Sequence, residues 1–157
     1  MSAEKTDAAT ECDARQIASA LEQVVRLYYS RSFCHDLKPA QWHALRYFAG
    51  TEPGNRTITA FARQRASTMG TASTTVSTLV RKGLLARSAD GTSARNLGLH
   101  VTPAGLELLE DDPINALVAS LDGLPVEERT QVQEALAKLV TDLERTPATE
   151  SATRPRQ

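Results

Sequence analysis

The sequence predicts a mainly α-helical protein with one small β-hairpin, and three observations support this fold class. Apolar residues recur at helical spacing over residues 14–35 and again over residues 103–145. Between them, residues 57–102 contain two short helical patterns followed by two short strand patterns. With 157 residues, 41% of them hydrophobic and only 4% aromatic, the chain fits one domain with an aliphatic core.

Charge is distributed unevenly along the chain. The stretch from Arg56 to Arg95 holds seven bases and one acid, a local charge of +6 in a chain whose total is −1. The bases are Arg56, Arg63, Arg65, Arg81, Lys82, Arg87 and Arg95, and the acid is Asp90. Residues 96–150 carry eleven acids and three bases instead, so they are expected to pack against protein. The basic segment has the charge that favours a phosphate backbone.

Two helices are expected first. The first runs from Ala14 to between Phe33 and His35, and its apolar stripe consists of Ile17, Leu21, Val24, Val25 and Tyr28. The second begins at Pro39, because a first helical turn does not need the N–H that proline lacks, and it stops at Gly50. Its apolar side consists of Trp42, Leu45, Tyr47 and Phe48.

The next segment is predicted to contain a brief strand and a short helix. Thr57-Ile58 has the composition of a strand, and Thr59 has the side chain of a helix N-cap. The short helix that follows buries Phe61 and Ala62. A turn through residues 67–68 then leads into the next helix.

A third pattern combines a helix with a hairpin. Residues 69–84 form an amphipathic helix that ends at Gly83, with Ala72, Val76, Leu79 and Val80 on its apolar face. Residues 84–88 and 96–101 read as two strands, and the connection over residues 89–95 contains an Asp-Gly pair, which is a strong turn signal. This hairpin is the candidate wing.

The C-terminal part is predicted to be helical with two interruptions. Thr102-Pro103 starts a helix whose apolar residues are Leu106, Leu108 and Leu109, and Asp111-Asp112-Pro113 interrupts it like an N-cap. The following stripes are Ile114, Leu117, Val118 and Leu121, then Val132, Leu136, Leu139, Val140 and Leu143, with Gly123 and Pro125 between them. Long amphipathic helices at both ends favour a homodimer. Padding of a monomer core is the alternative.

The helix over residues 69–82 has the features of a helix that enters a DNA major groove. Such a helix needs short polar side chains outside, a buried inner face and nearby cations. The candidate DNA-binding residues are Thr68, Thr71, Ser73, Thr74, Ser77, Thr78, Arg81, Lys82 and Arg95. The simpler interpretation is a solvated surface helix, but the preceding short helix, the hairpin and the local charge together favour DNA.

Several segments resemble the winged helix-turn-helix of the MarR family. They are Thr59-Ala60-Phe61-Ala62, Thr68–Val80, Arg81–Arg87 and Leu99–Gly105. The likeness covers roughly residues 14–145, and its most specific part is Lys82–Arg87 followed by a turn, an arginine, a strand and Val101–Gly105. The resemblance implies a cytoplasmic homodimeric transcription regulator that binds double-stranded DNA, usually as a repressor, on a pseudo-palindromic operator.

The resemblance also implies a domain organisation. Residues 13–145 form one MarR-like domain, with the winged helix-turn-helix over 37–102 and dimerisation helices over 14–35 and 103–145. The ends, 1–12 and 146–157, are expected to be disordered.

Single residues can be compared with the family in the same way. The recognition helix corresponds to Met69–Lys82, and the wing-tip arginine that enters the minor groove corresponds to Arg95. Family members often carry arginine where Thr74 stands and aspartate where Ser93 stands. This chain should therefore read fewer guanines and depend more on phosphate contacts, which salt weakens.

The family commonly releases DNA when a small aromatic or anionic effector enters a cleft beside the DNA-binding lobe. Here Tyr28, Trp42, His43 and Arg46 are the candidates to line such a pocket, with Arg46 or Arg26 pairing a carboxylate. Ordinary helix packing with exposed guanidinium groups explains the same residues equally well.

Other chemistry is weakly supported. Cys12 lies where peroxide-sensing relatives keep a reactive thiol, but neither Cys12 nor Cys34 has an activating cluster, so inert thiols are expected. The trio Cys34, His35 and Asp36 is adjacent along the chain, a geometry that disfavours one metal centre. No nucleophile with its base, phosphate-binding glycine loop or carboxylate pair is recognisable, so we expect no enzyme and no cofactor. A redox-sensing regulator, or an adaptor whose winged helix no longer binds DNA, remains the alternative function.

Neither a leader segment nor a run of eighteen apolar residues is recognisable, so a soluble cytoplasmic protein without membrane contact is expected.

Overall fold

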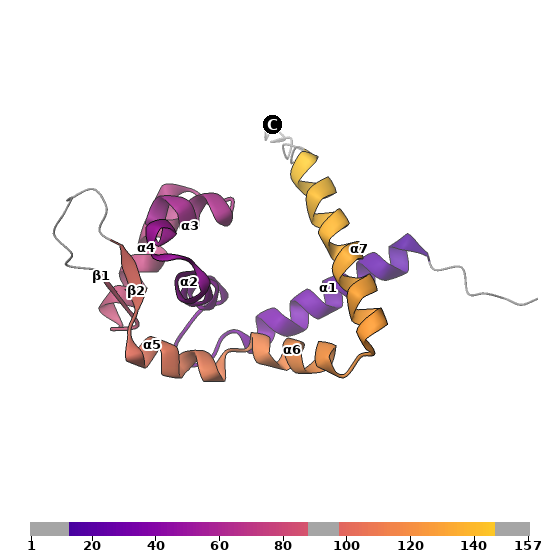
Figure 1. The fold of residues 1–157 in the computed structure, drawn as a ribbon, viewed down its shortest axis with the longest axis horizontal. Helices are drawn as coiled ribbons and strands as arrows, with labels where there is room; N and C mark the ends of the chain where they lie inside the picture. The colour runs from indigo at the N-terminus through magenta and orange to yellow at the C-terminus, as the bar shows by residue number, and fades with distance from the viewer. Residues whose placement is uncertain (1–12, 88–97, 147–157) are drawn as a thin grey trace, which may run out of the picture. The chain divides into compact units, whose positions relative to one another are not determined.

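The computed structural model describes residues 13–87 and 98–146, which form helices and one two-stranded sheet (Figure 1). The elements in chain order are α1 (Ala14–Arg31), α2 (Pro39–Gly50), η1 (Pro53–Asn55), α3 (Ile58–Gln64), α4 (Met69–Arg81), β1 (Leu85–Arg87), β2 (Leu99–Val101), α5 (Pro103–Leu108), η2 (Leu109–Asp111), α6 (Ile114–Asp122) and α7 (Val126–Arg145). The predicted fold class, mainly α with a small hairpin, is therefore confirmed.

The chain divides into two compact units, one up to Asn115 and one from Ala116 onward. The first contains the core, in which α2 is surrounded by α3, α4, the hairpin and α5 (Figure 1). Its largest fully buried side chains are Trp42, Phe48, Phe61, Leu45, Leu79, Leu85 and Leu99. Their burial supplies the main favourable free energy of folding of this unit, at about 25 cal/mol for each Å² of apolar surface.

One local prediction was wrong. Thr57 does not begin a strand, and Thr59 does not cap the short helix. Thr57 itself is the N-cap of α3, and its Oγ1 accepts a hydrogen bond of 3.1 Å from the backbone N–H of Ala60. Thr57 and Thr59, two positions apart, can each cap a helix, and the helix that starts after Thr57 buries Phe61 and Ala62 in the core.

Helix α4 ends before Gly83, as predicted from the sequence. Gly83 has a φ of +71°, a conformation that side chains with a Cβ rarely adopt. The backbone N–H of Gly83 donates to Val80 at 2.9 Å, and that of Leu84 donates to Leu79 at 3.0 Å. This pair of bonds is the Schellman arrangement, which turns the chain directly into β1.

The hairpin and α5 pack tightly together. Strands β1 and β2 are antiparallel, with Leu85 opposite Val101. Thr102 caps α5 as predicted, accepting a 3.1 Å hydrogen bond from the N–H of Gly105. A Cβ at Gly105 would collide with the backbone oxygen of Leu84 and lie 2.7 Å from Cγ1 of Val101, so only glycine fits there.

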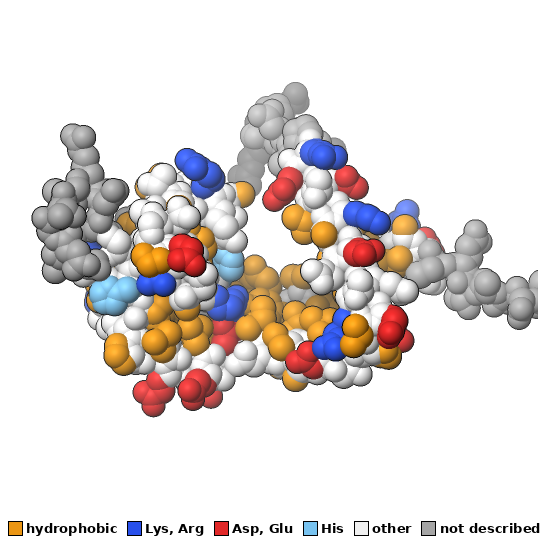
Figure 2. All heavy atoms as spheres, in the orientation of Figure 1, with side chains coloured by type: hydrophobic (Ala, Val, Ile, Leu, Met, Phe, Trp, Pro, Cys, Tyr) orange, Lys and Arg blue, Asp and Glu red, His pale blue; other side chains and the backbone are white. Residues whose placement is uncertain are grey.

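The second unit consists of most of α6 and all of α7. Within it, Arg129 pairs with Asp122 at 2.8 Å. Helix α7 carries charged side chains interspersed with exposed apolar ones (Figure 2). Among them, Val126 is 62% exposed and Leu143 is 71% exposed, so α7 has an apolar surface that this unit does not cover. Of the helices described, none has the length and apolar character needed to cross a bilayer.

Candidate nucleic-acid interface

Helix α4 is fixed by its buried face. Ala72, Val76 and Leu79 are almost completely buried and face the core, where α4 contacts α2 and α3. Thr68 caps its N-terminus by accepting a 3.2 Å hydrogen bond from the N–H of Thr71. A helix that is capped and buried on one side presents a fixed opposite side to solvent.

The outer side of α4 is a polar stripe. Gly70, Thr74, Ser77 and Arg81 follow each other at helical spacing, and all four are exposed. We call these residues the outer stripe. Thr71 is also exposed, whereas Ser73 and Thr78 are half-buried at its borders. The structure thus places the predicted helix residues on or beside one solvent-facing surface.

The hydroxyl groups on α4 differ in what they can offer a ligand. Thr74 donates its hydroxyl proton to the backbone oxygen of Gly70 at 3.0 Å, and Thr78 donates to that of Thr74 at 2.9 Å. Their methyl groups and oxygen lone pairs remain available. Among the described residues, none forms a hydrogen bond with the hydroxyl of Ser77, which keeps its donor as well.

The segment that contains the outer stripe is basic. From Arg56 to Arg87 the chain has six bases and no acid. Arg63, Arg81 and Arg87 are exposed, and no ion pair joins them to another described residue. Figure 2 shows a basic group at the edge of α3, acidic side chains over α5, and one acidic group beside a basic one in the middle of this unit.

Lys82, which was predicted to contact DNA, has an internal partner in the structure. Its Nζ is bound to the carboxylate of Asp36 and donates to the backbone oxygen of Asp36 at 2.6 Å. This pairing with Lys82 holds the pKa of Asp36 below its ordinary value. The predicted phosphate contact of Lys82 therefore competes with an internal ion pair that sequence spacing did not reveal. The predicted wing-tip Arg95 and the connection around it lie outside the described residues.

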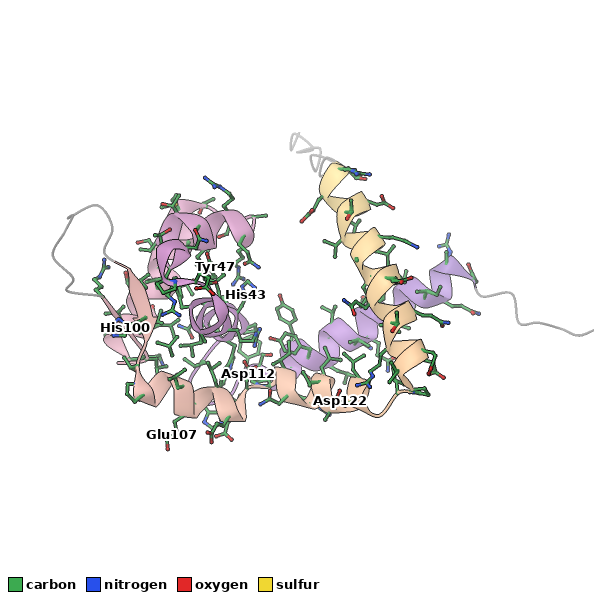
Figure 3. The ribbon with its side chains drawn as sticks, in the orientation of Figure 1. His43, Tyr47, His100, Glu107, Asp112 and Asp122 are labelled. Carbon is green, nitrogen blue, oxygen red and sulfur yellow. The ribbon has the colours of Figure 1, made fainter. Side chains whose placement is uncertain are left out.

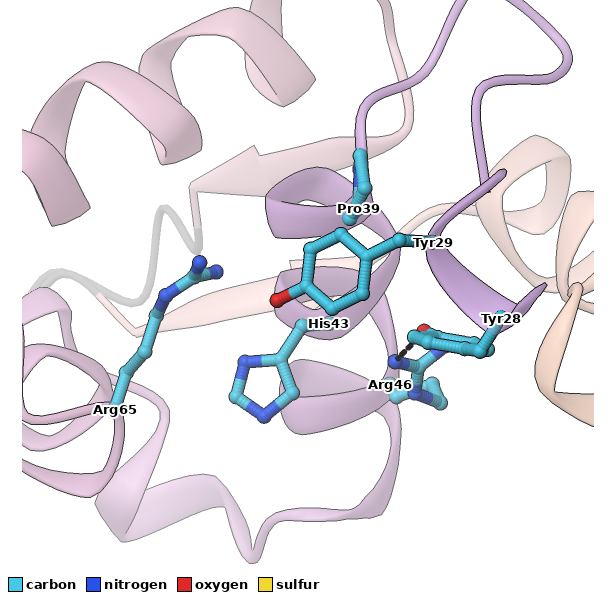
Figure 4. Close-up of a pocket in the computed structure, with 6 residues that line it drawn as sticks. All are labelled: Tyr28, Tyr29, Pro39, His43, Arg46 and Arg65. Carbon is cyan, nitrogen blue, oxygen red and sulfur yellow. Dashed lines mark hydrogen bonds between the residues drawn. The ribbon is translucent and has the colours of Figure 1, made fainter. Parts of the chain in front are cut away.

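A pocket of about 310 Å³ lies between residues of α1, α2 and the C-cap of α3 (Figure 4). It is lined by Tyr28, Tyr29, Pro39, His43, Arg46 and Arg65. Three of the four predicted residues are among them, but Trp42 is not. Trp42 is fully buried in the core, because it occupies the inner face of the helix that carries His43 on another side.

The guanidinium group of Arg46 is already hydrogen-bonded to Asp112 and Tyr28 in this pocket. Its Nη1 contacts both carboxylate oxygens of Asp112, at 2.7 and 2.8 Å, and its Nη2 donates to the Tyr28 hydroxyl at 2.8 Å. Burial works against the charged guanidinium, but these hydrogen bonds outweigh it and raise the pKa of Arg46. Asp112 is 4% exposed and also accepts from the N–H of Ile114 at 2.9 Å, so it is both the predicted cap and an ion-pair partner (Figure 3).

His43 lies between the two arginines of the pocket (Figure 4). Burial lowers its pKa, and the positive charges of Arg65 and Arg46 lower it further. Its ring is therefore neutral near pH 7. Its Nδ1 is buried without a hydrogen-bond partner among the described residues.

A reactive thiol or a metal centre finds little support in the described residues. Burial raises the pKa of the Cys34 thiol, and the nearby charge of Asp112 raises it further, which is the opposite of what a reactive thiol needs. Cys12 lies outside the described residues. His35 approaches Asp111 at 3.7 Å, but within the described ranges no three potential metal ligands come together.

Comparison with known proteins agrees with this geometry. A family model for the MarR family matches residues 35–96, which run from within the connection between α1 and α2 to beyond β1. A probable transcriptional regulator from Pseudomonas aeruginosa is 30% identical, with a TM-score of 0.55, and the match covers 79% of this chain and 96% of that one. The chain belongs to the MarR family.

Two solved structures of regulators bound to DNA share the fold of this MarR-family chain. FabT of Streptococcus pneumoniae in complex with DNA has a TM-score of 0.67 and 22% identity, with 84% of this chain and 98% of FabT covered. The MepR–DNA complex of Staphylococcus aureus has a TM-score of 0.65 and 21% identity, with 86% and 99% covered. A comparison with curated proteins finds no significant match.

Sequence reasoning missed three residues of this region. Arg65 and Asp36 lie in segments different from those of their partners, so no periodicity links them, whereas Tyr29 directly follows the predicted Tyr28 on α1. Asp112 was identified only as a cap, although a buried carboxylate requires a positive partner.

Proposed function

We propose that this MarR-family protein is a DNA-binding transcription regulator that acts as a homodimer and places α4 in the major groove. The observation that carries the proposal is the outer stripe, a polar helix face whose opposite face is buried, in a stretch from Arg56 to Arg87 that has six bases and no acid. MepR and FabT, which share the fold, were solved with DNA. In the proposed dimer, two copies of α4 enter successive major grooves about 34 Å apart on a pseudo-palindromic operator.

Salt dependence tests DNA binding itself. Binding to random double-stranded DNA should weaken as salt rises, by about 0.9 log units in affinity per log unit of salt for each phosphate neutralised. Fluorescence anisotropy at several salt concentrations measures this slope. An adaptor that has lost DNA binding should show no salt-dependent retention, and that result would refute the proposal.

Base reading by α4 has its own test. Ser77→Ala and Thr74→Ala should change the sequences selected from a random DNA pool, because both side chains lie in the outer stripe. Thr75→Ala is the matched control, since Thr75 is half-buried and donates to the backbone oxygen of Thr71 at 3.0 Å. Arg81→Ala should weaken all sequences equally, because a phosphate contact carries no sequence information. Equal behaviour of all four variants would contradict these roles.

Apolar surface on the terminal helices supports the homodimer. On α1, Ile17 is 44% exposed and Val25 is 54% exposed, and Leu143 on α7 is 71% exposed. Apolar stripes of this kind commonly mark protein interfaces. Sedimentation equilibrium should give twice the monomer mass of 17.0 kDa, and a monomer at micromolar concentration would refute the proposed assembly.

We further propose that the protein is a repressor released by a small effector in the pocket beside α2. The pocket lies within the unit that contains α4, and its volume of about 310 Å³ suits a molecule of one aromatic ring. The release part of the proposal predicts that a bound effector lowers DNA affinity, measured by adding candidate compounds to the preformed DNA complex.

A further inference from the structure

The connection between α1 and α2 is anchored at both of its ends. Ser32 and Leu37 are almost completely buried, and the Ser32 hydroxyl donates to the backbone oxygen of Tyr28 at 2.7 Å. Between these anchors, His35 and Asp36 are exposed and have φ angles of +53° and +55°. Residues with a Cβ rarely adopt this left-handed conformation, and here two adopt it in succession. Contacts from outside the connection must therefore stabilise its backbone.

One such contact comes from the end of the proposed recognition helix. Lys82, the C-cap of α4, directs its ammonium group to Asp36, where Nζ binds the carboxylate and donates to the backbone oxygen at 2.6 Å. A second contact is longer, since His35 lies 3.7 Å from Asp111 and both of these side chains are exposed. Lys82 thus holds the backbone of the connection as well as its carboxylate.

The ion pair of Lys82 and Asp36 can be exchanged for another partner. The side chain of Asp36 is 96% exposed, so the pair is open to solvent on the carboxylate side. Ion pairs open to solvent contribute little to stability. A phosphate offers the ammonium group the same kind of charged oxygen acceptor. Loss of the contact with Asp36 is also partly offset, because the connection then leaves its unfavourable backbone conformation.

We propose that Asp36 is an autoinhibitory residue, which holds Lys82 in the DNA-free protein and gives it up to a backbone phosphate when DNA binds. This inference rests on the proposed function, because it needs α4 to lie on DNA. Lys82 directly follows Arg81 of the outer stripe, so its long, flexible side chain can reach the phosphates beside that stripe once it is released. The carboxylate then lowers DNA affinity, and DNA binding releases the connection between α1 and α2.

DNA affinity tests the first of these consequences. Asp36→Asn removes the charge and keeps a residue that tolerates a left-handed backbone. It should tighten binding to random double-stranded DNA about two- to fivefold for each bound protomer, the effect of a solvent-exposed ion pair. In a Lys82→Gln background, Asp36→Asn should change affinity by less than about 1.5-fold, because the group that it frees is absent. Fluorescence anisotropy at low salt measures the four affinities.

Asp111→Asn is the matched control for charge. It removes another exposed acid, one that faces His35 and not Lys82, so DNA affinity should change by less than about 1.5-fold. Trp42, the only tryptophan, is fully buried, and its fluorescence in urea verifies that every variant is folded. The inference is overturned if Asp36→Asn binds DNA no more tightly, if it tightens binding equally in the Lys82→Gln background, or if Asp111→Asn tightens binding as much.

The thiol of Cys34 reports on the second consequence, release of the connection. Cys34 is half-buried in this connection, and Cys12→Ser leaves it as the only cysteine. DNA should increase the rate at which N-ethylmaleimide, an uncharged reagent, labels Cys34 by about twofold or more. In Asp36→Asn the connection is already free, so labelling should be fast without DNA and should change by less than about twofold when DNA is added. If DNA leaves the rate unchanged in the protein that retains Asp36, release of the connection is refuted.

The same affinities separate this inference from the proposed function. If no protein of the set binds DNA even at low salt, the proposed function fails and the inference fails with it. If the unmodified protein binds DNA and Asp36→Asn binds it no more tightly, the proposed function stands and the autoinhibitory role of Asp36 is refuted.

Discussion

Replacing Asp112 by alanine should destabilise the first unit more than any exposed substitution in the same segment. The Asp112 side chain is 2% exposed, and its two oxygens hold the guanidinium of Arg46. Without it, a largely buried positive charge loses its partner, which typically costs about 3–5 kcal/mol. The side chain of Arg46 is 24% exposed, so solvent compensates in part and the lower end of that range applies.

A second contribution adds to this cost. Asp112 also accepts the N–H of Ile114 at the start of α6, and losing a helix cap costs about 1 kcal/mol. Together the two effects give about 4 kcal/mol, a large share of the 5–15 kcal/mol that stabilises most domains. The melting temperature should fall by about 8–16 °C for a chain of this size.

Urea denaturation followed by Trp42 fluorescence measures the effect, because this single tryptophan is buried in the unit concerned. All proteins are compared at one protomer concentration. Asp111→Ala is the matched control, since that side chain is 67% exposed, and it should change stability by less than about 0.5 kcal/mol.

A double-mutant cycle then isolates the pair. Arg46→Ala with Asp112→Ala should be less destabilising than the sum of the single changes, because no unpaired charge remains. If Asp112→Ala resembles Asp111→Ala, or if the coupling energy is zero, the reasoning about this buried pair is wrong.

Three more predictions follow from the same structure. Gly105→Ala should lower the free energy of unfolding by about 1–3 kcal/mol, because the added Cβ would collide with the backbone of Leu84. Gly70→Ala, in the open first turn of α4, should not lower it, and the urea midpoints of the two variants compare the effects. Asp36→Ala should free the ammonium group of Lys82 for phosphate and steepen the slope of log affinity for DNA against log salt by up to about 0.9. An unchanged slope would count against this role of the pair. The lowered pKa of His43 lets the unfolded chain bind its proton first, so the stability that this group contributes is present above its ordinary value of 6.5 and is lost as pH falls. His43→Gln should flatten the profile of urea midpoints between pH 7 and pH 5, and parallel profiles would refute this.

Most of the fold could be predicted from the sequence because its signals are local. Pro39 and Thr102 start helices where predicted, and Gly83 ends one, since each effect depends on the backbone of a few neighbouring residues. The exception was the start of α3, where Thr57 and Thr59 offer the same chemistry. Because the two threonines have the same side chain, the local sequence does not determine which of them caps the helix. The packing of α3 against α2 determines it.

The candidate site was only partly predictable, because its decisive contacts join segments far apart in the chain. The helix face of α4 follows from periodicity alone. The pair of Arg46 and Asp112 spans 66 residues, and that of Lys82 and Asp36 spans 46. The sequence led us to assign Lys82 to phosphate and Arg46 to a ligand carboxylate, although each has an internal carboxylate partner.

These internal pairs change how the basic segment should be understood. Net charge suggests that every base near α4 serves DNA or ligand, but Lys82 and Arg46 are held by carboxylates, and Arg56 donates to the backbone oxygen of Thr51 at 2.6 Å. Among the described bases of this segment, Arg63, Arg81 and Arg87 are exposed and form no ion pair. The positive charge that the described part of this segment can offer to phosphate is therefore smaller than its net charge suggests.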